Sequence, residues 1–171
     1  MSSLIGRLIC LYMTIGIIFK TEITMSVNQA KYQCDECQKI VTANVGQTVI
    51  NSQLRWYLSY ECPSCNSAIE MDGIGFPPDE IRQNILAEEG EWNLIVKETE
   101  LKNKAKLSKL IRQALNLSLQ EVLQRLKNFP IITSGTKTEM QWLKQVLAEE
   151  GIDSSVEQKI QANQLLSNKR L

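Results

Sequence analysis

The sequence of 171 residues predicts an α+β protein with a β-rich first half and a mixed second half. Three observations predict this class. Two pairs of cysteines, each pair with two residues between its members, stand 24 residues apart in the first half. Apolar and polar residues alternate between Leu54 and Glu61, which is the period of a half-buried strand. In the second half apolar residues recur every three or four positions from Leu107 to Leu115, which is the period of a helix.

The first 24 residues contain an apolar run, residues 8–19, between Arg7 and Lys20. The run is shorter than the roughly 20 apolar residues that cross a bilayer. Three interpretations stay open: a start assigned too early, with Met25 as the true first residue; a weak membrane anchor through residues 8–19; or an export signal, although no small-x-small cleavage pattern follows. The first interpretation predicts a cytoplasmic protein. We assign no role to Cys10.

Four cysteines, Cys34, Cys37, Cys62 and Cys65, form the two C-x2-C pairs. Zinc prefers four soft ligands in a tetrahedron, and two residues between cysteines let one tight turn present both sulfurs to one ion. The arrangement resembles a zinc ribbon, in which CPSCN is the second knuckle and Asn66 takes the left-handed place usual for glycine. Iron in a four-cysteine shell has similar spacing and stays an alternative. A redox pair would need a βαβ context, and disulfides would need an oxidising compartment.

Residues 25–76 are predicted to form this N-terminal zinc-ribbon β module, with strands in KIVTANVGQTVI and LRWYLSYE. A module of this size buries little apolar surface, so the metal would contribute much of its folding free energy. Four thiolates leave no open coordination position, so we expect a structural Zn²⁺ and no catalysis at the metal. Exposed Arg55 and Tyr57 would either stack on a nucleic-acid base or form ordinary strand surface.

Residues 77–91 are predicted to form a helical connector. Pro77 and Pro78 stop the ribbon, and Pro78 suits the first turn of a helix, where Asp79 and Glu80 complement the helix dipole. Gly90 is expected to end that helix as a left-handed cap. Because the connector contains prolines, we expect the two halves of the chain to melt separately.

Residues 92–160 are predicted to form a small β-α-α-β-α-β domain with three helices on one face of a three-stranded sheet. Two capping boxes, Ser118 with Glu121 and Thr136 with Glu139, open the second and third of these helices. The tail, residues 161–171, is predicted to be a frayed helix or disordered. The apolar stripe expected for the second helix comprises Leu119, Val122, Leu123 and Leu126.

The stretch KAKLSKLIRQALNLSLQEVLQRLKNFP and the helix after it resemble the C-terminal domain of the bacterial ribosomal stalk protein, which recruits translation factors. The resemblance extends from Trp92 to about Ile160. Positions that fall in register with the family without a gap are Lys104, Lys109, Arg112, Leu117, Leu119, Glu121 and Pro130.

In that family the first two helices form the docking face for elongation factors, with lysines and an arginine that reach acidic partners. The resemblance implies this partner-binding role for Lys104, Lys109 and Arg112. The chain departs from the family at Asn116 and Ser118, which replace the two corner glycines. Further departures are Ser108, Gln120 and Leu123 at three positions of the docking helices, and a ribbon in place of the family's dimerising N-terminal region.

The chain contains no histidine, which excludes Ser-His and Cys-His catalysis and histidine metal ligands. Its net charge of zero hides a segregation: nine acidic and two basic residues in 66–100, then seven basic and one acidic in 101–130. We therefore predict a non-enzymatic zinc-binding adaptor. Its ribbon would contact RNA or protein, and its stalk-like domain an acidic protein, with the translation machinery as the candidate. A membrane-tethered regulator and an enzyme accessory subunit, with acidic residues around 70–91 lining a site, are the alternatives.

Overall fold

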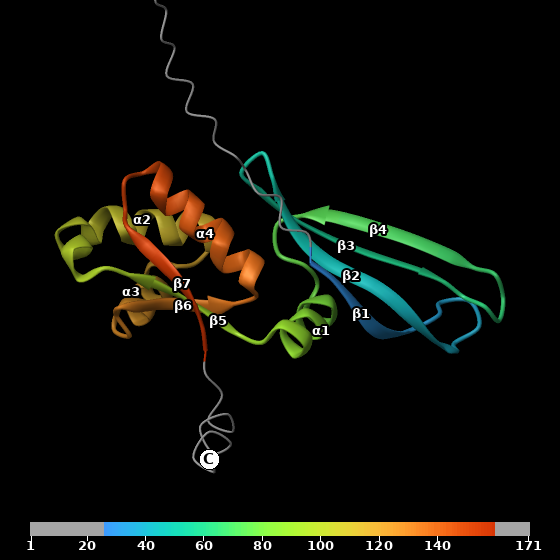
Figure 1. Cartoon of the computed structure of the whole chain (residues 1–171). Coiled ribbons are helices and arrows are strands. Elements are labelled where there is room, and N and C mark those ends of the chain that lie inside the picture. Colours follow the sequence, from blue (N-terminus) through green and yellow to red (C-terminus); the bar gives the residue numbers. More distant parts are fainter. Residues whose placement is uncertain (1–25, 160–171) are drawn as a thin grey trace, which may run out of the picture.

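The computed structural model describes residues 26–159, and this part of the chain contains four α-helices and two antiparallel sheets, which confirms the α+β class. Figure 1 shows a long four-stranded sheet beside a more compact half that holds the other sheet and most of the helices. The predicted leader, residues 1–24, and the predicted tail, residues 161–171, lie outside the described residues. The elements are β1 (Ser26–Gln33), β2 (Ile40–Ile50), β3 (Gln53–Glu61), β4 (Ala68–Ile74), α1 (Asp79–Glu89), β5 (Trp92–Val96), the 3-10 helix η1 (Glu98–Asn103), α2 (Lys104–Leu115), α3 (Leu119–Leu126), β6 (Ile131–Gly135), α4 (Lys137–Glu149) and β7 (Ser154–Gln158).

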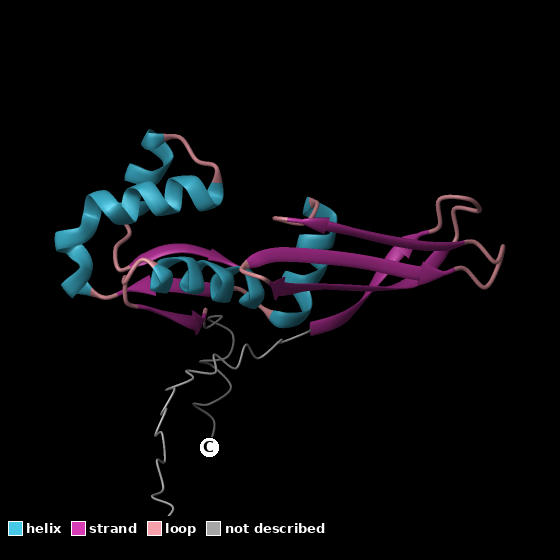
Figure 2. Cartoon of the chain, turned by 90° about the horizontal axis from the view of Figure 1, so that it is seen from above, coloured by secondary structure: helices cyan, strands magenta, loops and turns pink. Residues whose placement is uncertain are grey.

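The four-stranded sheet is a meander in the order β1-β2-β3-β4, and each strand is antiparallel to the next. Figure 2 shows it as one twisted sheet with two of its connecting loops together at the outer tip. Side chains alternate between the two faces, and β2 buries every second residue from Val41 to Val45 on the inner face. Ile81 and Ile85 of α1 complete the core on that face.

Helix α1 differs from its expected ends in two details. Pro78 precedes the helix as its N-cap instead of lying in the first turn. Gly90 ends the helix at φ 77° and ψ 174°, which is an extended conformation with positive φ and not the left-handed helical cap that we expected. Glycine adopts this conformation without the clash that a Cβ would cause.

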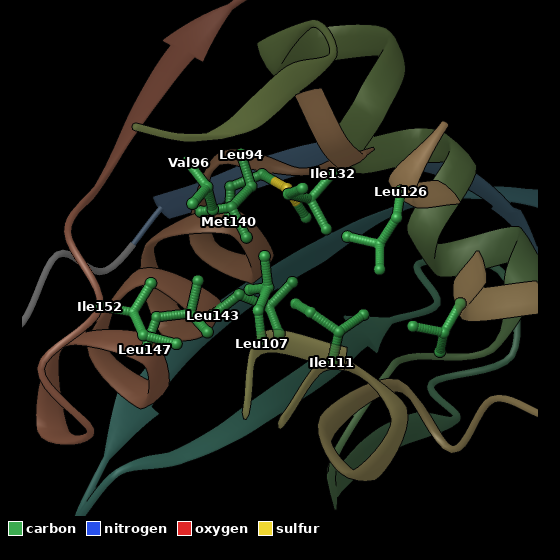
Figure 3. Packing of buried hydrophobic residues seen from close by; sticks show 11 residues of the cluster. Leu94, Val96, Leu107, Ile111, Leu126, Ile132, Met140, Leu143, Leu147 and Ile152 are labelled. Carbon is green, nitrogen blue, oxygen red and sulfur yellow. The ribbon is translucent and has the colours of Figure 1, made fainter. Parts of the chain in front are cut away.

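The second sheet has the order β6-β5-β7, with β5 in the centre and antiparallel to both neighbours. In Figure 1, α2 and α4 lie together over this sheet. Figure 3 shows side chains from β5, β6, α2, α3 and α4 pointing toward one another in a single core. Its buried members are Leu94, Val96, Leu107, Ile111, Val122, Leu126, Ile132, Met140, Leu143, Leu147 and Ile152.

Helix α3 buries only half of the stripe expected for it. Val122 and Leu126 are buried in the core, whereas Leu119 is 55% and Leu123 is 48% exposed. The expectation that all four apolar residues face the core was therefore wrong. The eight-residue helix packs on α2 and β6 through one narrow edge, and its other apolar edge faces solvent.

A polar network joins the two halves of the chain. Glu139 in α4 is fully buried, and its two carboxylate oxygens accept hydrogen bonds of 2.8 and 2.7 Å from Nε and Nη2 of Arg82 in α1. The backbone N–H of Thr136 also donates to Glu139, and the Thr136 hydroxyl donates to Gln47 of β2, which is itself fully buried. Buried polar groups need partners of this kind, so the fold ties α4 to both α1 and β2.

The turn between β2 and β3 makes a second contact with the compact half. The indole N–H of Trp142 donates to the backbone carbonyl of Ser52 at 3.0 Å, and the Ser52 hydroxyl donates to Glu149 at 3.0 Å. Phe76, just before the connector, packs edge-on against the Trp142 ring with centroids 5.9 Å apart. These contacts argue against our expectation that the two halves melt separately.

Candidate metal centre

The four cysteines lie in two turns at one end of the long sheet. Residues 34–39 connect β1 to β2, and residues 62–67 connect β3 to β4. In an antiparallel meander, the first and third turns meet at the same end, and both turns lie at the outer tip in Figures 1 and 2. The topology of the sheet therefore brings together two cysteine pairs that are 24 residues apart in the sequence.

The second turn has a tight, hydrogen-bonded geometry. The N–H of Asn66 donates to the carbonyl of Cys62 at 2.8 Å, and the N–H of Cys62 donates to the carbonyl of Ser67 at 2.8 Å. Asn66 has φ 59°, which confirms the left-handed conformation that we predicted at this position. Asparagine tolerates this region better than most residues.

The first turn repeats the same pattern. The N–H of Gln38 donates to the carbonyl of Cys34 at 2.8 Å, and the N–H of Cys34 donates to the carbonyl of Lys39 at 2.9 Å. Gln38 also has φ 59°, although glutamine rarely adopts this conformation. Its side chain donates to the carbonyl of Asp35, which holds the turn from the other side. The two turns thus present their sulfurs with equivalent backbone geometry.

The sulfur atoms have the spacing of a tetrahedral metal shell. All four Sγ atoms lie within 4.8 Å of one another. Across the two turns, Cys34 and Cys65 are 3.6 Å apart and Cys37 and Cys62 are 3.5 Å apart. A tetrahedron with Zn–S bonds of about 2.3 Å has an edge of about 3.8 Å, whereas a disulfide would bring two sulfurs to about 2.05 Å. The cluster fits a zinc ribbon, and four sulfurs at these distances can hold one metal ion.

Burial protects one side of the cluster. Cys34 and Cys62 are fully buried in the core of the β module, Cys37 is half-buried and Cys65 is exposed. Tyr60 extends this core, and its hydroxyl accepts a hydrogen bond of 3.2 Å from the backbone N–H of Asp35. Tyr60 therefore fixes the first turn from strand β3. The sequence contained a signal for this contact, because Tyr60 stands two residues before Cys62 on the buried side of a predicted strand.

Backbone N–H groups and neighbouring sulfurs shift the pKa values of Cys62 and Cys65 in opposite directions. The N–H of Ser64, followed by that of Cys65, lowers the pKa of Cys62 to about 6. The N–H of Ser67 also lowers the pKa of Cys65, but desolvation and the three neighbouring sulfurs outweigh it and raise that pKa to about 12. One thiolate therefore forms easily and the last forms with difficulty, as expected for groups that share one small space. A divalent ion bound by the four cysteines would remove the repulsion and hold all four sulfurs as thiolates.

The three predicted partner-binding residues lie far from the cysteines in the chain, on helix α2. Lys104 is its first residue, and Lys104, Lys109 and Arg112 are all exposed. A neighbouring lysine, Lys106, is instead engaged by Glu150 at the end of α4, at 2.9 Å. The structure thus leaves three cationic side chains of α2 accessible from solvent.

Comparisons with known proteins do not identify a family for this chain. No protein-family model, curated protein or solved structure matches the chain. Among the described residues, no helix has the length and apolar character needed to cross a membrane. The candidate site therefore rests on its own geometry, in which two equivalent turns bring together four sulfurs that can hold one metal ion.

Proposed function

We propose that this protein is a non-enzymatic, zinc-binding adaptor that docks an acidic protein partner on helices α2 and α3. In this proposal the metal stabilises the β module, and the compact half carries the docking face. The translation machinery is the candidate source of the partner, because the resemblance to the ribosomal stalk domain implies it. The predicted role of Lys104, Lys109 and Arg112 is part of this proposal.

One observation carries the proposal: α2 and α3 expose cationic and apolar side chains on adjacent elements. Leu119 and Leu123 stand one turn apart on α3 and are 55% and 48% exposed. Lys109 and Arg112 are exposed on α2, which packs against α3. Although exposed Glu121 lies between the two leucines, exposed apolar residues near cationic side chains are typical of protein-interaction sites.

The arrangement of the compact half also supports the resemblance. Its elements follow the order β5, α2, α3, β6, α4 and β7, with the short η1 before α2. The capping box of Ser118 and Glu121 is formed, and Asn116 ends α2 in the left-handed conformation at φ 50° and ψ 45°. A non-glycine residue can therefore hold the corner where the family has glycine.

Charge favours a protein partner over RNA for the β module. Residues 26–76 contain five acidic and three basic side chains, for a net charge of −2. Four thiolates and one Zn²⁺ would add a further −2, giving −4 in total. RNA binding depends on neutralising phosphates with cations, so this module is poorly suited to RNA. The closed sulfur shell likewise supports a metal without catalytic chemistry.

The docking proposal is tested by charge reversal on α2. The double variant Lys109→Glu and Arg112→Glu should lose binding to a purified bacterial elongation factor, measured by biolayer interferometry. Its matched control, Lys39→Glu and Lys144→Glu, makes the same change in net charge at exposed positions on β-module and α4 surfaces. Binding by the wild type should also weaken as salt rises, because exposed charges are screened within about 10 Å at 0.1 M.

Three results would count against the proposal. The first is that the wild type shows no saturable binding at low salt. The second is that the α2 variant binds as tightly as the wild type, and the third is that the control variant loses as much binding as the α2 variant. A membrane-tethered regulator is the alternative. Recovery of the full-length chain in the membrane pellet, and its loss from that pellet when residues 1–24 are deleted, would favour that alternative.

A further inference from the structure

A cavity of about 300 Å³ lies between α1, the α2–α3 corner, β6 and α4. Arg82 of α1 and Arg125 of α3 both line it, with the hydroxyl residues Thr133 and Ser134 of β6 on another side. We propose that this cavity binds a small ligand that carries one carboxylate or phosphate group on a compact apolar body. The site is separate from the cysteine cluster and from the proposed docking residues.

The lining of the cavity carries a net positive charge, because it contains two arginines and a single acidic residue, Glu139. Glu139 lines the cavity but accepts hydrogen bonds from Arg82, from the Thr136 N–H and, at 3.4 Å, from the Gln47 amide. One of the two guanidinium charges is thus neutralised within the protein. The other, on Arg125, has no acidic partner in the lining, although Glu121 acts on it electrostatically from outside the cavity.

Each guanidinium keeps donors for a ligand. Arg82 uses Nε and Nη2 for Glu139, and no hydrogen bond from its Nη1 occurs in the described part of the chain. Arg125 uses Nη1 for the hydroxyl of Thr133. Asp79 and Glu91 act on Arg82 electrostatically but do not line the cavity. Arginine presents its donors in a planar fork that matches carboxylate and phosphate oxygens.

The rest of the lining is apolar, so we expect the part of the ligand that lies against it to be apolar as well. Leu115 and Leu117 at the α2–α3 corner, Met140 of α4 and Phe76 contribute this surface. Small-molecule sites combine such apolar walls with a few convergent polar groups, and their volumes start at roughly 300 Å³. The cavity is therefore large enough for a single ring or a short branched chain next to the anionic group.

Phenyl phosphate is a suitable probe because it has one ring and one phosphate. Titrated into the zinc-loaded full-length protein, it should cause saturable chemical-shift changes at the amides of Thr133 and Ser134 in ¹⁵N–¹H spectra. Phenol, which lacks the phosphate, should cause none. Arg125→Met should weaken phenyl phosphate binding by at least roughly tenfold. Lys127→Met, which removes a charge just beyond α3 and outside the cavity, should leave binding unchanged.

The outcomes separate cleanly. Saturable shifts that need the phosphate and Arg125 support the site. Equal shifts with phenol, equal weakening in both variants, or no saturable shift in the wild type would overturn it. If the spectrum of Arg125→Met shows a changed fold, Leu117→Trp replaces it, because a large ring fills the cavity without changing charge. Unchanged binding in a folded Leu117→Trp variant would then refute the proposal.

Discussion

Replacing Arg82 with methionine tests the junction between the two halves most directly. The substitution keeps an apolar stem of similar length but removes both guanidinium hydrogen bonds to Glu139, of 2.8 and 2.7 Å. Glu139 is fully buried, so its carboxylate would lose its cation and keep only the Thr136 N–H and the Gln47 amide as donors. The reverse does not hold for Arg82, whose side chain is 26% exposed and can be hydrated.

The expected loss of stability in Arg82→Met follows from how deeply the two side chains are buried. Removing one partner of a buried ion pair costs about 3–5 kcal/mol, because the other charge stays buried and unpaired. Two features of this site lower the cost: Arg82 is partly exposed, and Thr136 and Gln47 still donate to Glu139. We therefore expect Arg82→Met to lower the free energy of unfolding by about 3 kcal/mol. For a chain of this size that corresponds to a Tm lower by about 6–12 °C.

The assay is urea unfolding of the zinc-loaded protein followed by circular dichroism. The matched control is Lys97→Met, which breaks the ion pair of Lys97 with Asp153, where both side chains are more than half exposed. Exposed pairs contribute about 0–1 kcal/mol, so this control should change stability little. The reasoning fails if Arg82→Met falls within about 1 kcal/mol of the control, since that would mean that the buried carboxylate does not depend on its cation.

Three further predictions concern the metal and the junction. Cys62→Ser should abolish stoichiometric metal binding in native mass spectrometry. Because the two halves share a polar network, it should also lower the melting temperature of both halves in a single transition. Retention of one ion per chain, or an unchanged second transition, would contradict this. Metal affinity, measured by competition with a chromophoric chelator, should fall as pH drops from about 8 to 5, because protons and metal compete for the same sulfurs and even the pKa of Cys62 is about 6. An affinity that does not change with pH would be inconsistent with thiolate ligands. Gly135→Ala should cost about 1–3 kcal/mol by thermal unfolding, because an added Cβ would lie 2.8 Å from Nη2 of Arg82 and overlap Oε2 of Glu139. A Tm equal to that of the wild type would show that this junction can relax.

Features set by neighbouring residues could be predicted from the sequence. The cysteine pairs, the left-handed Asn66 and the capping boxes that start at Ser118 and Thr136 each depend on contacts within a few positions. Such contacts are fixed by turn and helix geometry, so the local sequence is enough. Strands β2 and β3 could also be predicted, because apolar and polar residues alternate along them with a period of two.

Features set by distant residues could not be predicted. Glu139 was identified only as a capping residue, and its pairing with Arg82 joins positions 57 apart in the chain. The exposure of Leu119 and Leu123 likewise depends on how α3 meets α2 and β6 and not on the apolar pattern of α3 itself. The left-handed Gln38 carried no signal, because glutamine is not a residue type that marks such a turn.

The long sheet sets a distance between the two ends of the molecule. Strand β3 runs for nine residues from the β2–β3 turn, which touches α4, to the first cysteine of the second pair. At about 3.3 Å per residue this is about 30 Å, well beyond the range over which exposed charges act through physiological salt. Charges at the cysteine end of the sheet and charges on the compact half are therefore screened from each other, and the length of β3 sets how far apart partners bound at the two ends would lie.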